Sequence, residues 1–298
     1  MVKCSENSPR GASGLGRGGK RSASRRSPSA LHDLLSDGSQ LCWESEGALK
    51  VKEATRVLTL TQAVLKDNAV LAGLSPSIIP DFLEVAKLID LKTPQQIYEA
   101  GREIQKVYFP IDAVLSVVTE MRDGGSIEVG TVGREGASAI RLLLGATSSA
   151  NESYCQVPGR AVVITSDQFH RLLRADDGFR SVLGRFLQAY VNMLGQLAAC
   201  NRVHNLYERC ARWLLLTHDR VNSDEIALTH EYLAMMLGSR RSGVTMAACA
   251  FQQAGFIRYA HGHIVILNRT GLEQASCECY AVARAQFGPL LGMIELSK

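Results

Sequence analysis

The chain has 298 residues and a formal net charge of +4, with 46% hydrophobic and 21% charged residues. This is the composition of an ordinary globular protein, and the length leaves room for two domains with their own cores. No apolar run reaches the roughly 18 residues of a membrane-spanning helix, so we expect no membrane partner.

Residues 1–55 are predicted to be a disordered basic extension. Residues 1–30 carry seven Lys or Arg against Glu6, a net +6, which leaves −2 for the remaining 268 residues. Any electrostatic attraction to DNA is therefore local rather than global. The segment GASGLGRGGKRSASRRSPSA offers almost no apolar surface to bury. Burial could therefore not offset the conformational entropy that the segment would lose on ordering. It is either an arm that touches DNA phosphates or a dispensable extension.

Residues 56–175 are predicted to form a β-roll. An amphipathic helix is expected over 77–91, with Pro80 tolerated near its first turn. Short strands separated by glycine-containing turns then indicate a small barrel or roll. The expected strands are 96–98, 106–109, 114–119, 127–132, 154–157 and 160–164. Thr165 and Gln168 form a capping-box pattern that starts a helix through Arg174.

Residues 176–201 are predicted to form a long dimerisation helix. Apolar residues repeat at spacings of three and four from Val182 to Ala198, and this stripe is wider than one small domain requires. The helix is either buried within its own domain or connects two domains and pairs with its twin. We favour the second interpretation, in which the chain forms a homodimer.

Residues 202–298 are predicted to form a winged helix-turn-helix domain that starts with a helix over 206–218. Thr229 is expected to cap the first motif helix, with Leu228 and Leu233 as a hydrophobic staple. Gly238 suits a turn that needs positive φ. The recognition helix is placed near 239–254, with one apolar face formed by Val244, Ala247, Ala248 and Phe251.

The opposite face of this second helix carries polar and basic side chains, where a recognition helix contacts base edges. Two helices with paired arginines are also common in ordinary helical domains. Two short strands, 256–259 and 264–267, follow Gly255 and indicate a wing, which favours DNA binding. The predicted DNA-binding residues are Thr229, Ser239, Arg240, Arg241, Ser242, Thr245, Met246 and the wing residue His261.

Cysteine and histidine patterns predict no metal site, no cofactor and no catalytic residues. The eight cysteines are scattered and form no C-x₂-C pair, and Cys277 and Cys279 flank a single residue. They fit a reducing cytosol, so a cytoplasmic location is expected. No Ser/His/Asp, Cys/His or paired-carboxylate arrangement can be assembled from spacing, and we expect that the chain is not an enzyme.

A β-roll, a long helix and a winged helix in this order resemble the Crp/Fnr family of bacterial transcription regulators. The resemblance rests on VYFPIDAVLSVV and VGREG in the roll, ERCARWLLL, and LTHEYLAMMLGSRRSGVT, and it covers roughly residues 60–280. It implies an α+β fold with an N-terminal cyclic-nucleotide-binding-like β-roll, a long dimerisation helix and a C-terminal winged helix-turn-helix domain. It also implies that the β-roll at 56–175 is an effector-sensing domain.

The resemblance also implies a function and partners. A regulator of this type is a dimer that reads an inverted-repeat site in double-stranded DNA, with RNA polymerase as a candidate partner. The alternative is a cyclic-nucleotide-type domain that regulates a protein partner rather than DNA. Arg241 matches the arginine with which the family reads guanine. Ser242 stands where the family often has an acidic base-reading residue, and Met246 where it has a basic one. The target sequence should therefore differ from the best-known consensus of the family, with Arg240 taking part in base reading instead.

The predicted effector pocket departs from the cyclic-nucleotide binders that the chain resembles. Its residues are Gly133, Arg134, Glu135, Gly136 and Arg141. The family's phosphate-binding arginine falls at 150–153, where no arginine stands and an acidic residue would repel a phosphate. Use of the pocket arginines instead would need a different geometry. Cyclic AMP is therefore disfavoured, and the effector is unknown.

Overall fold

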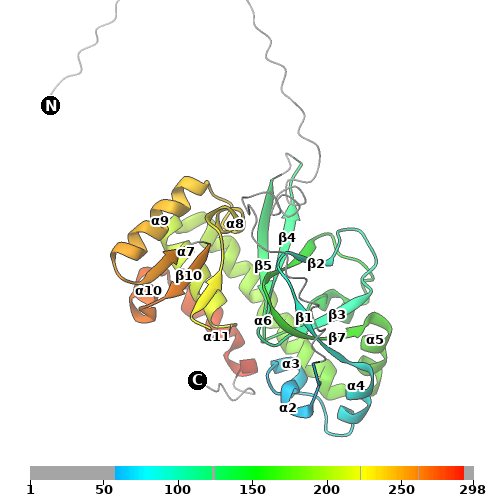
Figure 1. The fold of residues 1–298 in the computed structure, drawn as a ribbon. Helices are drawn as coiled ribbons and strands as arrows, with labels where there is room; N and C mark the ends of the chain where they lie inside the picture. Colours follow the sequence, from blue (N-terminus) through cyan, green and yellow to red (C-terminus); the bar gives the residue numbers. More distant parts are fainter. Residues whose placement is uncertain (1–57, 123–124, 222, 261, 292–298) are drawn as a thin grey trace, which may run out of the picture.

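A computed structural model describes residues 58–122, 125–221, 223–260 and 262–291. These residues form two lobes joined by one long helix, α6 (Figure 1). The predicted extension at 1–55 and the wing residue His261 lie outside the described residues. Among the helices that are described, none is long and apolar enough to cross a membrane.

The first lobe is a roll of two antiparallel sheets with helices at one end. One sheet has the strand order β1-β7-β3 and the other β2-β6-β4-β5. The strands are β1 (Lys87–Leu91), β2 (Gln95–Tyr98), β3 (Lys106–Pro110), β4 (Val114–Glu120), β5 (Ser126–Val132), β6 (Glu152–Val157) and β7 (Gly159–Thr165). The helices are α2 (Gln62–Leu65), α3 (Ala69–Ala72), α4 (Ile79–Val85), the 3-10 helix η2 (Ile140–Leu144) and α5 (Ser166–Ala175).

Aromatic residues fill the core of this lobe. The ring of Phe109 lies 6.2 Å from Phe82 and 6.3 Å from Phe179, and Phe179 lies 5.8 Å from Phe169. All four side chains are fully buried, and aromatic pairs at these separations contribute beyond their buried area. They join the strand β3 to the helices α4, α5 and α6, and so fix the base of α6 against the roll.

The prediction of a helix over 77–91 is wrong in its second half. Helix α4 ends at Val85, with Pro80 in its first turn as expected, and residues 87–91 form strand β1. This strand pairs antiparallel with β7, so that Lys87 lies opposite Val163 and Leu91 opposite Gly159. Hydrogen bonding to an available sheet edge overrides the helical periodicity of the segment.

The remaining predicted strands of the roll are all present, as is the capping box before α5. Thr165 Oγ1 accepts a hydrogen bond from the backbone N–H of Gln168, whose side chain accepts one from the backbone of Thr165. Helix α6 (Asp177–Val203) follows directly and has 27 residues. Asp176 caps it by accepting hydrogen bonds from Gly178 and Phe179.

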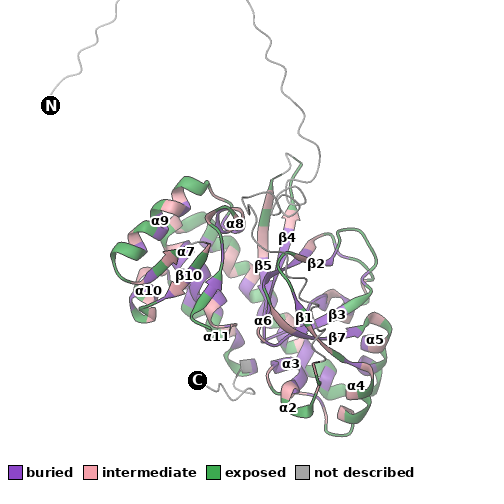
Figure 2. Ribbon diagram, viewed as in Figure 1, coloured by how far each residue is buried: buried purple, intermediate pink, exposed green. Residues whose placement is uncertain are grey.

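The second lobe contains the helix-turn-helix, with α8 and α9 (Figure 1), and a three-stranded sheet of order β8-β10-β9. Figure 2 shows exposed positions along α9. The elements of this lobe are α7 (Leu206–His218), β8 (Glu225–Ala227), α8 (His230–Met236), α9 (Arg241–Gln253), β9 (Ile257–Ala260), β10 (His263–Ile266), α10 (Arg269–Ala275) and α11 (Cys279–Leu291). Positive φ angles at Gly238, Gly255 and Gly262 form the turns between them. The predicted winged helix is therefore present, and β8, α10 and α11 extend it.

Candidate nucleic-acid interface

The helix-turn-helix is held together by one cap and one apolar seam. Thr229 Oγ1 accepts a 3.2 Å hydrogen bond from the backbone N–H of Tyr232 and so caps α8, as predicted. Leu228 and Leu233, the predicted staple, are both buried, and so is the small residue Ala234. The inward face of α9 consists of the predicted residues Val244, Ala247, Ala248 and Phe251, all buried.

The outward face of α9 presents the side chains that the sequence assigns to DNA. Arg240, Arg241, Ser242 and Met246 are exposed, and Met246 retains 59% of its accessible surface although it is apolar. Thr245 and Ser239 are partly buried. Helix α9 begins after Arg240 as its N-cap, slightly later than predicted, so both arginines lie at the first turn. Such a turn enters deepest into the major groove.

Thr229 lies beside this face and also borders the wing. It is exposed at the start of α8, and a Cβ atom added to Gly262 in the wing turn would lie 3.7 Å from Thr229 Cγ2. The wing turn and the first helix of the motif are therefore adjacent. Of the predicted DNA-binding residues, only His261 cannot be placed, because it lies outside the described residues.

Arg241 is held by an acidic neighbour in this structure. Its guanidinium forms an ion pair with the carboxylate of Glu231 on α8, and both side chains are well exposed. Exposed ion pairs of this kind contribute only about 0–1 kcal/mol. A guanine edge or a phosphate can therefore replace Glu231 as the partner of Arg241 at little cost.

His230 is a further residue at this face, which sequence reasoning missed. Its ring stacks on Tyr259 of β9 at a centroid distance of 4.0 Å, and its Nδ1 atom lies 3.1 Å from Thr245 Oγ1. Burial lowers the pKa of His230, which the charge of Glu231 opposes. The ring thus links α8, α9 and the wing. The Thr-His pair at a helix start was its only sequence signal.

The helix-turn-helix also packs against the roll. Trp213 of α7 donates a 2.8 Å hydrogen bond from Nε1 to the carboxylate of Glu128 on β5, and Ser116 of β4 donates to the same carboxylate at 2.7 Å. The Sδ atom of Met236 lies 3.3 Å from Ser116 Oγ. Burial raises the pKa of Glu128 to about 7, although both hydrogen bonds oppose the shift.

The predicted effector residues are mostly enclosed by other parts of the chain. Gly133, Arg134, Glu135 and Gly136 are buried. The Glu135 carboxylate accepts hydrogen bonds from the backbone N–H of Gly133 at 3.1 Å and from Arg220 Nε at 2.9 Å. Arg220 follows α7, so a residue of the second lobe occupies the carboxylate that the resemblance assigns to a ribose.

Close packing leaves little room beside these residues. A Cβ atom added to Gly133 would lie 2.5 Å from Arg220 Cδ, and one added to Gly136 would lie 2.1 Å from the ring of Phe186 on α6. Arg141 is the one predicted pocket residue that is partly exposed. It donates hydrogen bonds to Ser149 Oγ at 2.9 Å and to Asn151 Oδ1. Its guanidinium is therefore already hydrogen-bonded to residues of the roll.

Three cysteines and a histidine meet where the two lobes join. The Sγ atoms of Cys200, Cys277 and Cys279 and one ring nitrogen of His204 all lie within 4.8 Å of one another. The expectation that the cysteines are scattered is therefore wrong for these three. The signal was present as a Cys and a His four residues apart on a helix and a Cys-x-Cys pair, but the fold was needed to bring the two pairs together.

Comparison with known proteins agrees with this architecture. Residues 208–275 match the Crp-like helix-turn-helix domain family. Among curated protein sequences, none matches the chain. Many solved structures share the fold, at low identity.

Three of these structures illustrate the likeness. A CRP-family transcriptional regulator of Thermus thermophilus is 20% identical, covers 63% of this chain and 96% of its own, and has a TM-score of 0.52. FixK2 of Bradyrhizobium japonicum is 14% identical, with 65% and 98% covered and a TM-score of 0.53. The c-di-GMP responsive global regulator CLP of Xanthomonas campestris is 15% identical, with 64% and 99% covered and a TM-score of 0.51.

Proposed function

We propose that this chain, which carries a Crp-like helix-turn-helix domain on the fold of the Crp/Fnr regulators, is a sequence-specific transcription regulator that binds an inverted-repeat DNA site as a homodimer. The proposal depends chiefly on one observation. Helix α9 buries its apolar face and presents Arg240, Arg241, Ser242 and Met246 to solvent at its first turns. This is the geometry with which a recognition helix reads the major groove.

The chemistry of these side chains indicates which bases of the DNA half-site they would recognise. A guanidinium can bond bidentately to the O6 and N7 atoms of guanine, and Arg241 is the side chain best placed to do so. Ser242 is short and accepts or donates one hydrogen bond, whereas Met246 offers only apolar contact, which suits a thymine methyl group. The preferred half-site therefore contains a guanine next to positions that are read weakly or by apolar contact.

Helix α6 supplies the surface for the homodimer. One face of α6 packs on the roll, where Tyr190 and Leu194 approach Gly130 of β5. A second face carries Asn192, which donates to Gln286 of α11 at 2.9 Å. The third face is largely open to solvent and contains Gly184, Leu187, Val191, Gly195 and Ala198. Its apolar surface and small residues suit close pairing with a second copy of the helix.

The described residues of the roll disfavour a cyclic nucleotide as an effector. A buried phosphodiester needs a fixed cation, and Arg141 is bonded to Ser149 and Asn151. Glu135 is bonded to Arg220, so the ribose-binding carboxylate is also occupied. A cyclic nucleotide would have to break both arrangements before it could bind.

The test is in vitro selection of random duplex DNA with the purified full-length protein, followed by footprinting of the selected sites. The expected result is a pair of guanine-containing half-sites related by inverted repeat, with centres about 34–36 Å apart along the helix axis. Binding without sequence enrichment would contradict the proposal. Enrichment of a single, unrepeated half-site would retain the DNA-reading role but contradict the homodimer.

A further inference from the structure

The four side chains at the lobe junction form a compact and buried set of soft ligands. Cys200 and His204 lie one helical turn apart at the end of α6, and Cys277 and Cys279 lie at the start of α11. The three cysteines form their own buried cluster, exposed by 0–5%, and the His204 side chain retains 15% exposure. Thiolates and imidazole are the ligands of structural zinc sites.

The distances between these atoms suit one ion. The Sγ atoms of Cys200 and Cys277 are 3.6 Å apart, and Cys279 Sγ lies 3.5 Å from His204 Nδ1. Bonds of about 2.3 Å to sulfur and about 2.0–2.1 Å to nitrogen separate the ligands of tetrahedral zinc by roughly 3.5–3.8 Å. The two measured separations fall in that range.

Side chains around the cluster form polar contacts with His204 and Cys279 of the kind that orient metal ligands. The Nε2 atom of His204, on the far side of the ring from Cys279, lies 3.2 Å from the carboxylate of Glu278. A carboxylate in this place fixes the ring and raises the basicity of the ligating nitrogen. Gln196 also donates a 3.0 Å hydrogen bond from Nε2 to Cys279 Sγ, an interaction that favours a thiolate.

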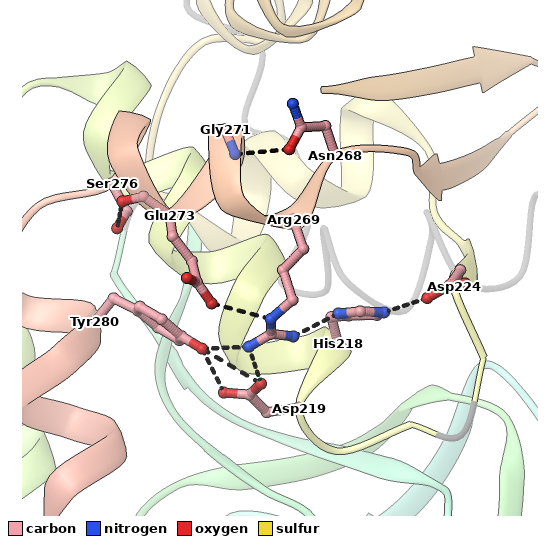
Figure 3. A network of polar contacts seen from close by, with 9 residues as sticks. All are labelled: His218, Asp219, Asp224, Asn268, Arg269, Gly271, Glu273, Ser276 and Tyr280. Carbon is pink, nitrogen blue, oxygen red and sulfur yellow. Dashed lines mark hydrogen bonds and ion pairs between the residues drawn. The ribbon is translucent and has the colours of Figure 1, made fainter. Parts of the chain in front are cut away.

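A polar network joins α10 and the start of α11 to the end of α7, close in sequence to the cysteine pair (Figure 3). Arg269 of α10 donates to Asp219 at 2.5 Å, to His218 Nδ1 at 2.7 Å and to Glu273 at 3.0 Å. Tyr280, which directly follows Cys279, donates to Asp219 at 3.0 Å. The start of α11 is thereby anchored to the end of α7, so the two cysteines do not depend on a metal for their placement.

We infer that Cys200, His204, Cys277 and Cys279 form a tetrahedral site for one zinc ion, which clamps α11 and the second lobe to the end of α6. Zinc would bind through His204 Nδ1 and three thiolates. Each thiol that ligates loses its proton to solvent, and no electrons are exchanged. The ion would span the short junction between Val203 and Leu206, where the two lobes connect.

The first test is metal analysis of the purified full-length protein, kept reduced throughout. We expect about one zinc ion per chain, and cobalt exchanged into the site should give the visible absorption of a tetrahedral, thiolate-rich complex. This spectrum reports whether the wild-type protein binds the ion tetrahedrally through several thiolates, so it does not depend on whether a variant folds. Removal of zinc with a chelator should lower Tm, because binding to the folded state stabilises it.

Matched variants then separate ligands from other cysteines. Cys279→Ser should lose the zinc ion, whereas Cys249→Ser, at an exposed position of α9, and Cys210→Ala, buried in α7, should retain it. Glu278→Gln should keep the ion but bind it about 10–100-fold more weakly in competition with a chelator. That loss of affinity would not follow from a purely structural role of Glu278.

Four results would overturn the inference. One is a reduced wild-type protein that neither contains zinc nor binds zinc or cobalt on reconstitution. Another is the recovery of iron with acid-labile sulfide, which would indicate a cluster instead of a single ion. The third is equal loss of zinc from Cys279→Ser and Cys249→Ser, which would place the bound metal elsewhere. A Cys200–Cys277 disulfide that persists under reducing conditions would likewise exclude the site.

Discussion

Arg241 stands at the first turn of α9 with its guanidinium already paired with a carboxylate, so the proposed DNA binding would exchange this partner for a base edge or a phosphate. The Glu231 pair is exposed on both sides and therefore weak. A bidentate bond to guanine is worth about 1–3 kcal/mol of discrimination. Phosphates, in contrast, attract the same guanidinium equally on every sequence.

We therefore expect Arg241→Ala to weaken binding to the selected site by about 1–3 kcal/mol more than binding to random duplex. Titration of both DNAs at several salt concentrations would measure this difference. Arg185→Ala, at an exposed position of α6, serves as the control of equal charge and should leave the discrimination unchanged. Equal losses of Arg241→Ala on the two DNAs would reassign this arginine to the phosphate backbone.

The cyclic-nucleotide response is also decided by single residues. Glu135 is held by Arg220, and Arg141 by Ser149 and Asn151, so neither ribose nor phosphate has a ready partner. Loss of one member of a buried ion pair costs several kcal/mol, or about 10³-fold or more in affinity. Calorimetry with millimolar cyclic AMP or cyclic GMP should show no heat above dilution, and DNA affinity should not change. Micromolar binding would show that Arg134 or Arg141 rearranges to meet the phosphate.

At the scale of elements, the contact between β5 and α7 contains a titrating group. The folded-state pKa of Glu128 is raised from 4.5 to about 7 by burial. Its protonated form is therefore favoured by folding, and this stabilisation is complete below pH 4.5 and is lost as the pH rises through about 7. Solvent access to the half-buried carboxyl limits the effect to about 1–2 kcal/mol.

Glu128→Gln should remove this pH dependence, because the amide keeps an acceptor for Trp213 and does not titrate. The free energy of unfolding of the wild-type protein relative to the variant should fall between pH 4.5 and about 7 and stay level above that. Urea titrations followed by tryptophan fluorescence, in a Trp43→Phe background, would measure it. A difference that is constant with pH would contradict the raised pKa.

The elements themselves were predictable where a local pattern decides them. Thr165 and Thr229 cap helices as their sequences indicate, and Gly238 adopts the positive φ that its turn requires. The strand at 87–91 was missed because its pairing with β7 is a long-range contact that no local period reveals. The exposed face of α9 was predictable because the spacing of its apolar residues is also a local pattern.

The cysteine cluster was not predictable from spacing. Cys200 and Cys277 lie 77 residues apart, and only the packing of α11 on α6 brings them within 3.6 Å. Arg220 and Glu135, which are also in contact, are likewise 85 residues apart in the sequence. Both features lie where the two lobes meet. The way in which the lobes pack against each other cannot be recognised from the local sequence pattern of either lobe.

At the scale of the whole molecule, the open face of α6 is the surface through which we propose that two copies of the chain pair. Val191 retains 56% of its accessible surface. At Gly184 and Gly195 on the same face, an added Cβ would meet nothing within 4 Å beyond the neighbouring residues and the backbone of α6 itself. Leu194, at the edge of this face, partly packs on Gly130 of the same chain. Val191 is therefore the sharper probe of an interface between copies.

We expect Val191→Asp to yield a monomer that loses inverted-repeat binding, because a dimer would bury an unpaired carboxylate. Leu194→Asp should also weaken the dimer, with some added loss of stability from the contact with β5. Sedimentation at several protein concentrations would measure both. Arg185→Asp, exposed on α6 away from the open face, should remain dimeric. If Val191→Asp also stays dimeric, the interface lies elsewhere.

The junction between the lobes has a mechanical consequence. Helix α6 ends at Val203 and α7 begins at Leu206, and His204 and Asn205 are the caps of the two helices. Two helices that meet at so short a joint change their relative orientation mainly by rotation about the few backbone torsions between them. A rotation at this joint would change the angle between α6 and the second lobe, and the length of that lobe would magnify the change into a displacement of α9. Such a rotation would also have to break the contacts of Glu128 with Trp213 and of Glu135 with Arg220.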